Sequence, residues 1–70
     1  MRTDPEIVIP RKVNSLRKNE GWTQKRLAEE AGTTQATISR IESAMVANVS
    51  ISMADGLAQA FGITIDELIQ

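Results

Sequence analysis

The sequence of 70 residues contains no cysteine and no histidine. Disulfides are therefore excluded, and the usual sets of nucleophile, base and metal ligand cannot be assembled. We accordingly expect no enzymatic activity, no metal and no cofactor. The acidic pairs at 29–30 and 66–67 are explained by a solvated helix face and by helix capping. The sequence also has no glycine-rich phosphate-binding loop.

Aromatic residues and long apolar runs are scarce as well. With one Trp, one Phe and no Tyr, the core has to be mainly aliphatic. No apolar run approaches the roughly 20 residues of a membrane span, and the N-terminus lacks the apolar core of a signal peptide. We expect a soluble, cytoplasmic protein, and the lack of cysteine fits a reducing compartment. The length fits a single domain near the lower size limit for an apolar core.

The net charge of −1 argues against binding to nucleic acid, but the charge is unevenly distributed. All eight basic residues lie before position 43, where six acidic residues leave a net charge of +2. Residues 43–70 contain three acidic residues and no basic ones, a net charge of −3. This asymmetry could orient the amino-terminal side toward phosphates. Because the field is weak, we expect modest affinity with strong salt sensitivity.

Residues 23–42, TQKRLAEEAGTTQATISRIE, predict two short amphipathic helices joined by a three-residue turn. The first helix covers Gln24–Ala31, and its apolar face contains Leu27, Ala28 and Ala31. Gly32 suits the left-handed end of that helix, and the threonines at 33 and 34 can cap the next one. The buried side of the second helix contains Ile38 and Ile41. This pattern is typical of a helix-turn-helix, whose second helix can enter the DNA major groove.

At these residues the sequence resembles the phage Cro and repressor type of helix-turn-helix, the Xre-like family. The resemblance extends to residues 50–69, with an alanine-rich helix, a glycine break and an Asp-Glu-Leu ending, and to Arg17 and Gly21 upstream. It covers residues 11–69. It implies an all-α, compact five-helix bundle with a central helix-turn-helix, like the DNA-binding domain of lambda repressor.

Residues 1–10 are expected to form an N-terminal arm and residues 11–70 the DNA-binding domain. Pro5, Pro10 and the β-branched residues 7–9 favour an extended segment. Three interpretations remain open: an ordered lead-in with Ile9 over the core, a strand that pairs with a partner chain, and a disordered arm. The first helix is expected to run from Pro10 or Arg11 to Asn19, with two apolar residues facing inward, Val13 and Leu16.

Two further helices are predicted near the C-terminus. Ser50 is expected to cap a helix that ends at Gly62 and has an apolar face of Ile51, Ala54, Leu57, Ala58 and Phe61. Gly56 within it costs about 1 kcal/mol relative to alanine and would allow close packing. Thr64 to Glu67 form a capping box for the last helix, and the pair Ile63 and Leu68 has the spacing of a hydrophobic staple. Trp22 and Leu27 repeat that spacing, so Trp22 is interpreted as a packing residue rather than a platform for bases.

The second helix of the motif, at about residues 35–43, carries the candidates for reading DNA bases. With the isoleucines buried, its outer surface presents Gln35, Ala36, Thr37, Ser39 and Arg40. Glutamine can bond adenine and arginine can bond guanine through two hydrogen bonds each. The methyl groups of Ala36 and Thr37 could contact a thymine methyl.

The candidates for phosphate contacts surround this helix. Gln24 begins a helix whose free N–H groups favour an anion, and the resemblance implies that it anchors the helix to a phosphate. The other candidates are Thr23, Thr34, Lys12, Lys25 and Arg26. The resemblance also implies an ion pair between Arg17 and Glu42, so Arg17 is given a structural role.

Residues 43–49 differ from the family, which commonly has glycine, basic residues and a proline there. This neutral, apolar segment favours either a protein partner at Met45, Val46 and Val49 or packing of these residues onto the core. We therefore weigh two functions: a DNA-binding regulator, acting as a dimeric repressor on an inverted repeat of double-stranded DNA, and a protein-interaction module or antitoxin-type protein. The homodimer contacts would involve Ile65, Ile69 or the segment 7–9.

Overall fold

The computed structural model describes residues 5–43 and 49–69, and the side chains of these residues from Ile9 onward. Within them lie five α-helices: α1 (Pro5–Asn19), α2 (Gln24–Ala31), α3 (Gln35–Glu42), α4 (Ile51–Phe61) and α5 (Ile65–Leu68). The described residues contain no strand. The predicted all-α fold with five helices and a central helix-turn-helix is confirmed.

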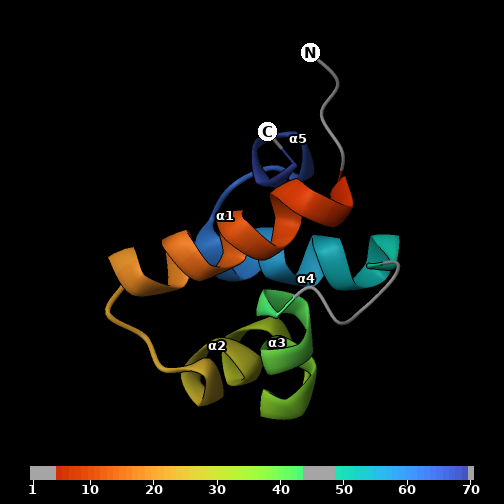
Figure 1. The fold of residues 1–70 in the computed structure, drawn as a ribbon. Helices are drawn as coiled ribbons and strands as arrows, with labels where there is room; N and C mark the ends of the chain where they lie inside the picture. The colour runs from red at the N-terminus through yellow and green to blue at the C-terminus, as the bar shows by residue number, and fades with distance from the viewer. Residues whose placement is uncertain (1–4, 44–48, 70) are drawn as a thin grey trace.

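The helices surround one aliphatic core. In Figure 1, α2 and α3 form one end of the molecule, α5 lies beside the start of α1 at the other end, and α4 crosses between them. Contacts join α2 to α3 and α4, α1 to α3 and α5, and α4 to α5. The buried cluster consists of Ile9, Val13, Leu27, Ala28, Ile38, Ile41, Ala54, Leu57 and Leu68. Every helix contributes to it, so the position of α3 depends on the whole bundle.

The helix ends follow local sequence signals. Four predicted N-caps accept a hydrogen bond from the backbone N–H three residues later: Thr23, Thr34, Ser50 and Thr64. Gly32 and Gly62 end α2 and α4 with φ of 73° and 68°, in the left-handed region that glycine adopts without strain. The capping box of α5 is complete, because the Glu67 side chain also accepts from the Thr64 N–H at 3.1 Å.

The first helix begins earlier than the sequence predicts. Residues 5–10 belong to α1 instead of an extended arm, so the predicted start at Pro10 or Arg11 is wrong, and so is the strand interpretation. Pro10 lies inside the helix and leaves one backbone carbonyl without its N–H donor. However, Ile9 and Val13 are both buried and lie four residues apart, on one helical face. Burial of that face across the proline offsets the lost hydrogen bond. The expected cover of the core by Ile9 is confirmed.

The apolar face of α4 also differs at one residue. Ala54, Leu57 and Ala58 are buried as predicted, but Ile51 is 83% exposed, so its assignment to the buried face is wrong. Ile51 is the first residue of α4, at the end that extends beyond α1 and α3 in Figure 1. The predicted face is therefore correct from Ala54 onward, whereas the first residue of the helix lies outside the core.

Gly56 brings α2 and α4 into close contact. A Cβ atom at this position would lie 2.9 Å from the carbonyl oxygen of Ala31, the last residue of α2. That distance is shorter than Cβ atoms tolerate against a backbone atom. The absence of a side chain at Gly56 thus sets the spacing between α4 and the first helix of the helix-turn-helix.

Candidate nucleic-acid interface

The helix-turn-helix is held by backbone hydrogen bonds at its turn. The Gly32 N–H donates to the Glu29 carbonyl at 3.4 Å, and the Thr33 N–H donates to the Ala28 carbonyl at 2.9 Å. These bonds satisfy carbonyls at the end of α2 that have no partner within the helix. Thr34 then caps α3 through the Thr37 N–H, which donates to its hydroxyl at 3.2 Å. The turn therefore fixes the angle between α2 and α3 by local geometry.

The outer side of α3 is polar and accessible. Ile38 and Ile41 are buried, while Gln35, Ala36 and Arg40 are exposed. The other two predicted base-reading residues, Thr37 and Ser39, are half-buried. The Thr37 hydroxyl lies 2.9 Å from the Thr34 hydroxyl, so the two side chains hold each other. Three of the five predicted base-reading residues thus form an exposed set on one helix.

Arg17 and Glu42 form the ion pair that the resemblance implies. Nε of Arg17 donates to Oε2 of Glu42 at 2.7 Å, and Nη2 donates to Oε1 at 3.1 Å. The remaining guanidinium nitrogen, Nη1, donates to the Trp22 carbonyl at 2.7 Å. The side chains are 14% and 5% exposed, respectively. Arg17 is therefore occupied in joining α1, the segment before α2 and the end of α3.

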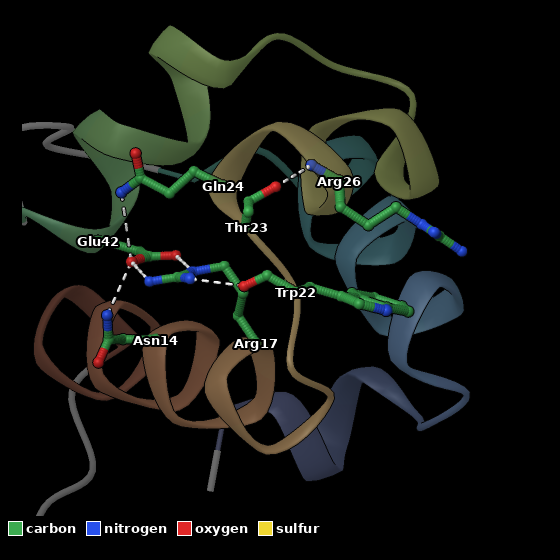
Figure 2. Close-up of polar contacts among 7 residues, drawn as sticks. All are labelled: Asn14, Arg17, Trp22, Thr23, Gln24, Arg26 and Glu42. Carbon is green, nitrogen blue, oxygen red and sulfur yellow. Dashed lines mark hydrogen bonds and ion pairs between the residues drawn. The ribbon is translucent and has the colours of Figure 1, made fainter.

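Two further side chains donate to the same carboxylate. Nδ2 of Asn14 lies 2.7 Å from Oε1 of Glu42, and Nε2 of Gln24 lies 3.5 Å from that oxygen. Figure 2 shows donors from α1 and α2 converging on Glu42 of α3. The contact with Asn14 was missed from the sequence, because a polar residue 28 positions away leaves no local pattern. Gln24 lies at the start of α2, as predicted, and is half-buried.

This surrounding keeps the carboxylate charged. Burial raises the pKa of Glu42, but hydrogen bonds from Arg17 and Asn14, the charge of Arg17 and the bond from Gln24 together lower it more. The net result is a pKa below the ordinary value for glutamate. The hydrogen bond to Glu42 is the main cause that raises the pKa of Arg17.

The predicted phosphate-binding cations differ in how they are placed. Lys25 is exposed and Lys12 is half-buried. Arg26 is instead paired with Glu30, with Nε 3.0 Å from Oε1, and its guanidinium lies 5.6 Å from the centre of the Trp22 ring. In Figure 2 it points away from Gln24. The spacing of Arg26 and Glu30, four residues apart on one helix, was the signal that could have predicted this pairing.

Trp22 packs within the protein. Its ring is stacked on Phe61, with centroids 5.8 Å apart and an interplanar angle of 18°, and it is half-buried against the core. These contacts support the interpretation of Trp22 as a packing residue. Thr23 is likewise engaged, since its hydroxyl accepts from the Arg26 N–H at 3.0 Å as the cap of α2. In the part of the chain that the structure describes, no group of three or more acidic residues is placed to hold a metal ion.

Comparison with known proteins identifies this architecture. Residues 13–68 match the family described as Helix-turn-helix. The chain belongs to the Xre-like helix-turn-helix family. It is 35% identical over 60 residues to the competence pilus inhibition repressor of Acinetobacter baylyi, a match that covers 86% of this chain and 54% of that protein. The chain therefore spans about half the length of this curated relative.

Two solved structures have the same fold. The hypothetical transcription factor NHTF from Neisseria is 27% identical, with a TM-score of 0.88 over 96% of this chain and 76% of that one. SinR, the master regulator for biofilm formation, was crystallised in complex with DNA; it is 26% identical, with a TM-score of 0.82 over 89% of this chain and 98% of that one. Residues 13–68 thus form a helix-turn-helix domain of the kind found in DNA-binding transcription regulators. Within the described residues, no helix has the length and hydropathy to span a membrane.

Proposed function

We propose that this protein is a sequence-specific repressor that binds double-stranded DNA as a homodimer, with α3 in the major groove. The observation that carries this proposal is the exposure of Gln35, Ala36 and Arg40 on α3, while Ile38 and Ile41 of the same helix are buried. The buried face anchors the helix in the bundle, which leaves the other face available to base edges.

Each exposed side chain on α3 suits a particular contact. Gln35 is the first residue of the helix, from where its amide could bond N6 and N7 of adenine. Arg40 could donate two hydrogen bonds to O6 and N7 of guanine, and Ala36 could contact a thymine methyl group. Thr37 and Ser39 are half-buried and would contribute methyl or hydroxyl contacts at the edge of this set.

Phosphate contacts would fix the orientation of α3. Gln24 is the first residue of α2, and Thr34 directly precedes α3. At both helix starts, free N–H groups and the helix dipole favour an anion. Lys25 and Lys12 would add charge, and Thr23 would contribute through the backbone at its cap. Arg26 is left out of this set, because Glu30 and Trp22 already hold its guanidinium.

The small area of α3 that can contact base edges favours a dimer. One helix reads a few base pairs, and a two-fold axis doubles the site, with half-sites about 34–36 Å apart on one face of DNA. The half-buried Ile65 and Ile69 are the candidate contacts between copies. The relative from Acinetobacter baylyi supports a repressor, and the DNA complex of SinR supports binding through this fold. A repressor in a bacterium would act in the cytoplasm, where the DNA is.

The test is selection of bound duplexes from a random DNA library at about 0.15 M salt, where exposed charges are substantially screened. Enrichment of an inverted repeat with half-sites one helical turn apart is expected. The double variant Gln35→Ala, Arg40→Ala should lose this enrichment. A matched control, Gln59→Ala with Lys18→Ala, removes a glutamine and one positive charge from exposed positions outside α3 and should keep the enrichment.

The alternative function makes the opposite prediction in that experiment. A protein-interaction module would enrich no sequence while remaining folded. Its predicted contact residues Met45 and Val46 lie outside the described residues, whereas Val49 packs against the core. The exposed Ile51 would then be the first apolar residue to replace in a search for the partner.

A further inference from the structure

Three of the four hydrogen bonds to the Glu42 carboxylate come from α1. Oε1 accepts from Asn14 at 2.7 Å and from Arg17 at 3.1 Å, and Oε2 accepts from Arg17 at 2.7 Å. The bond from Gln24 is the longest of the four, at 3.5 Å, which is beyond the usual range of N–H···O distances. The carboxylate would therefore lose little if Gln24 moved away from it.

The Gln24 amide, in contrast, has hydrogen-bonding capacity that is not used within the protein. Its Nε2 carries two hydrogens, and the bond to Glu42 occupies one of them weakly. The neighbouring carboxylate also fixes the orientation of the amide, because Nε2 and not Oε1 has to face Glu42. The remaining hydrogen lies at the start of α2, where the backbone favours an anion. Gln24 is thus held with its donor oriented and can still be released.

We propose that Asn14 is a positioning residue for DNA binding. By donating a short hydrogen bond to Glu42, it makes Gln24 unnecessary to that carboxylate and leaves the Gln24 amide available to a backbone phosphate. This inference rests on the proposed function, since it assigns an indirect role at the same DNA-binding site. It adds a residue on α1 that lies outside the helix-turn-helix itself.

Removal of Asn14 would change which acceptor the Gln24 amide binds, the Glu42 carboxylate or a DNA phosphate. Oε1 of Glu42 would lose its shortest hydrogen bond, and Gln24 is the nearest remaining side-chain amide that donates to it. Oε1 would keep the bond from Arg17 at 3.1 Å, which leaves unused acceptor capacity on a nearly buried carboxylate oxygen within reach of Gln24. Gln24 would then be drawn toward Glu42, at the expense of its bond to phosphate.

The test is a double-mutant cycle measured by binding to the selected operator. Asn14→Ala, Gln24→Ala and the double variant are compared with the wild-type protein. We expect Asn14→Ala to weaken binding about fivefold in the wild-type background and to have no further effect when Gln24 is alanine. The dependence of affinity on salt should stay unchanged, because neither side chain carries a charge.

A second measurement separates positioning from loss of structure. Replacing single operator phosphates by uncharged methylphosphonates identifies the phosphate whose neutralisation weakens binding by wild-type protein but not by Gln24→Ala. Binding by Asn14→Ala should likewise be unaffected by neutralisation of that phosphate, and it should respond to neutralisation of every other phosphate as the wild-type protein does. Asn14→Leu, which fills the space without a donor, is a second variant if the alanine variant unfolds. Gln59→Ala, which removes another side-chain amide bonded to a carboxylate, is the control.

The outcomes are distinct. Equal losses from Asn14→Ala with and without Gln24, or weakening at every phosphate, would overturn the positioning role and leave the proposed function intact. Failure of the wild-type protein to select any DNA sequence would overturn the proposed function and the inference with it.

Discussion

Arg17 on α1 and Glu42 at the end of α3 are joined by two hydrogen bonds, the shorter of them 2.7 Å long. A negative charge at a helix C-terminus is unfavourable, because the helix dipole is negative there. Arg17 neutralises this charge and, through the Trp22 carbonyl, also holds the segment that leads into α2. The pair therefore sets the position of both helices of the DNA-binding motif relative to α1.

Loss of Arg17 should destabilise the protein more than loss of Arg26. Arg17→Ala leaves a nearly buried carboxylate without its charge partner, which we expect to cost about 2–3 kcal/mol. Arg26 is paired on the surface, so Arg26→Ala should cost about 1 kcal/mol or less. For a domain of this size, each kcal/mol lowers the melting temperature by about 4–8 °C. Equal melting shifts for the two variants would contradict the structural role of Arg17.

The same pair should make stability depend on pH in the acidic range. Because the folded pKa of Glu42 lies below its ordinary value, the stabilisation is complete above about pH 4.3, the unfolded value. It is lost as the pH falls from there through the folded pKa. Melting of the wild-type protein and Glu42→Gln should therefore differ most at pH 7 and converge as the pH falls below about 4.3. A difference that stays constant over this range would show that the charge of Glu42 does not contribute.

The features predicted correctly from the sequence are those with a local signature. The N-caps Thr34 and Thr64 are recognisable within four residues of sequence. Gly32 and Gly62 adopt left-handed backbone angles, and each follows the last apolar residue of its helix. The exposed side of α3 follows from Ile38 and Ile41 alone, because burial of two residues three apart fixes the rotation of the helix.

The features that were wrong or missed depend on the tertiary structure. Pro10 taken alone disfavours a helix, because proline cannot donate the backbone hydrogen bond at its position. Burial of Ile9 and Val13 on one helical face outweighs the loss of that bond. Exposure of Ile51 depends on where the covering helices end. The bond from Asn14 to Glu42 joins residues 28 positions apart, which no spacing rule connects.

Gly56→Ala should destabilise the protein, although alanine is the better helix former by about 1 kcal/mol. The new Cβ would lie 2.9 Å from the Ala31 carbonyl oxygen, a backbone atom, so α2 and α4 would have to separate. We expect a net loss of about 1–3 kcal/mol, as for other overpacked sites. Chemical denaturation measures it, with Gln59→Ala on the exposed face of the same helix as a control. A gain in stability would mean that the two helices are not in close contact.

Arg40 and Lys25 should affect DNA binding in different ways. Arg40→Ala removes a proposed contact to a guanine and should cost about 1–3 kcal/mol on the operator, with loss of discrimination at one base pair. Lys25→Ala removes a proposed phosphate contact, so it should weaken binding to all duplexes alike and reduce the salt slope by about one. Titrations against the operator and its single-base variants, at several salt concentrations, separate the two effects. If Arg40→Ala weakens every duplex equally, Arg40 contacts phosphate, and Gln35 at the start of α3 becomes the main candidate for reading bases.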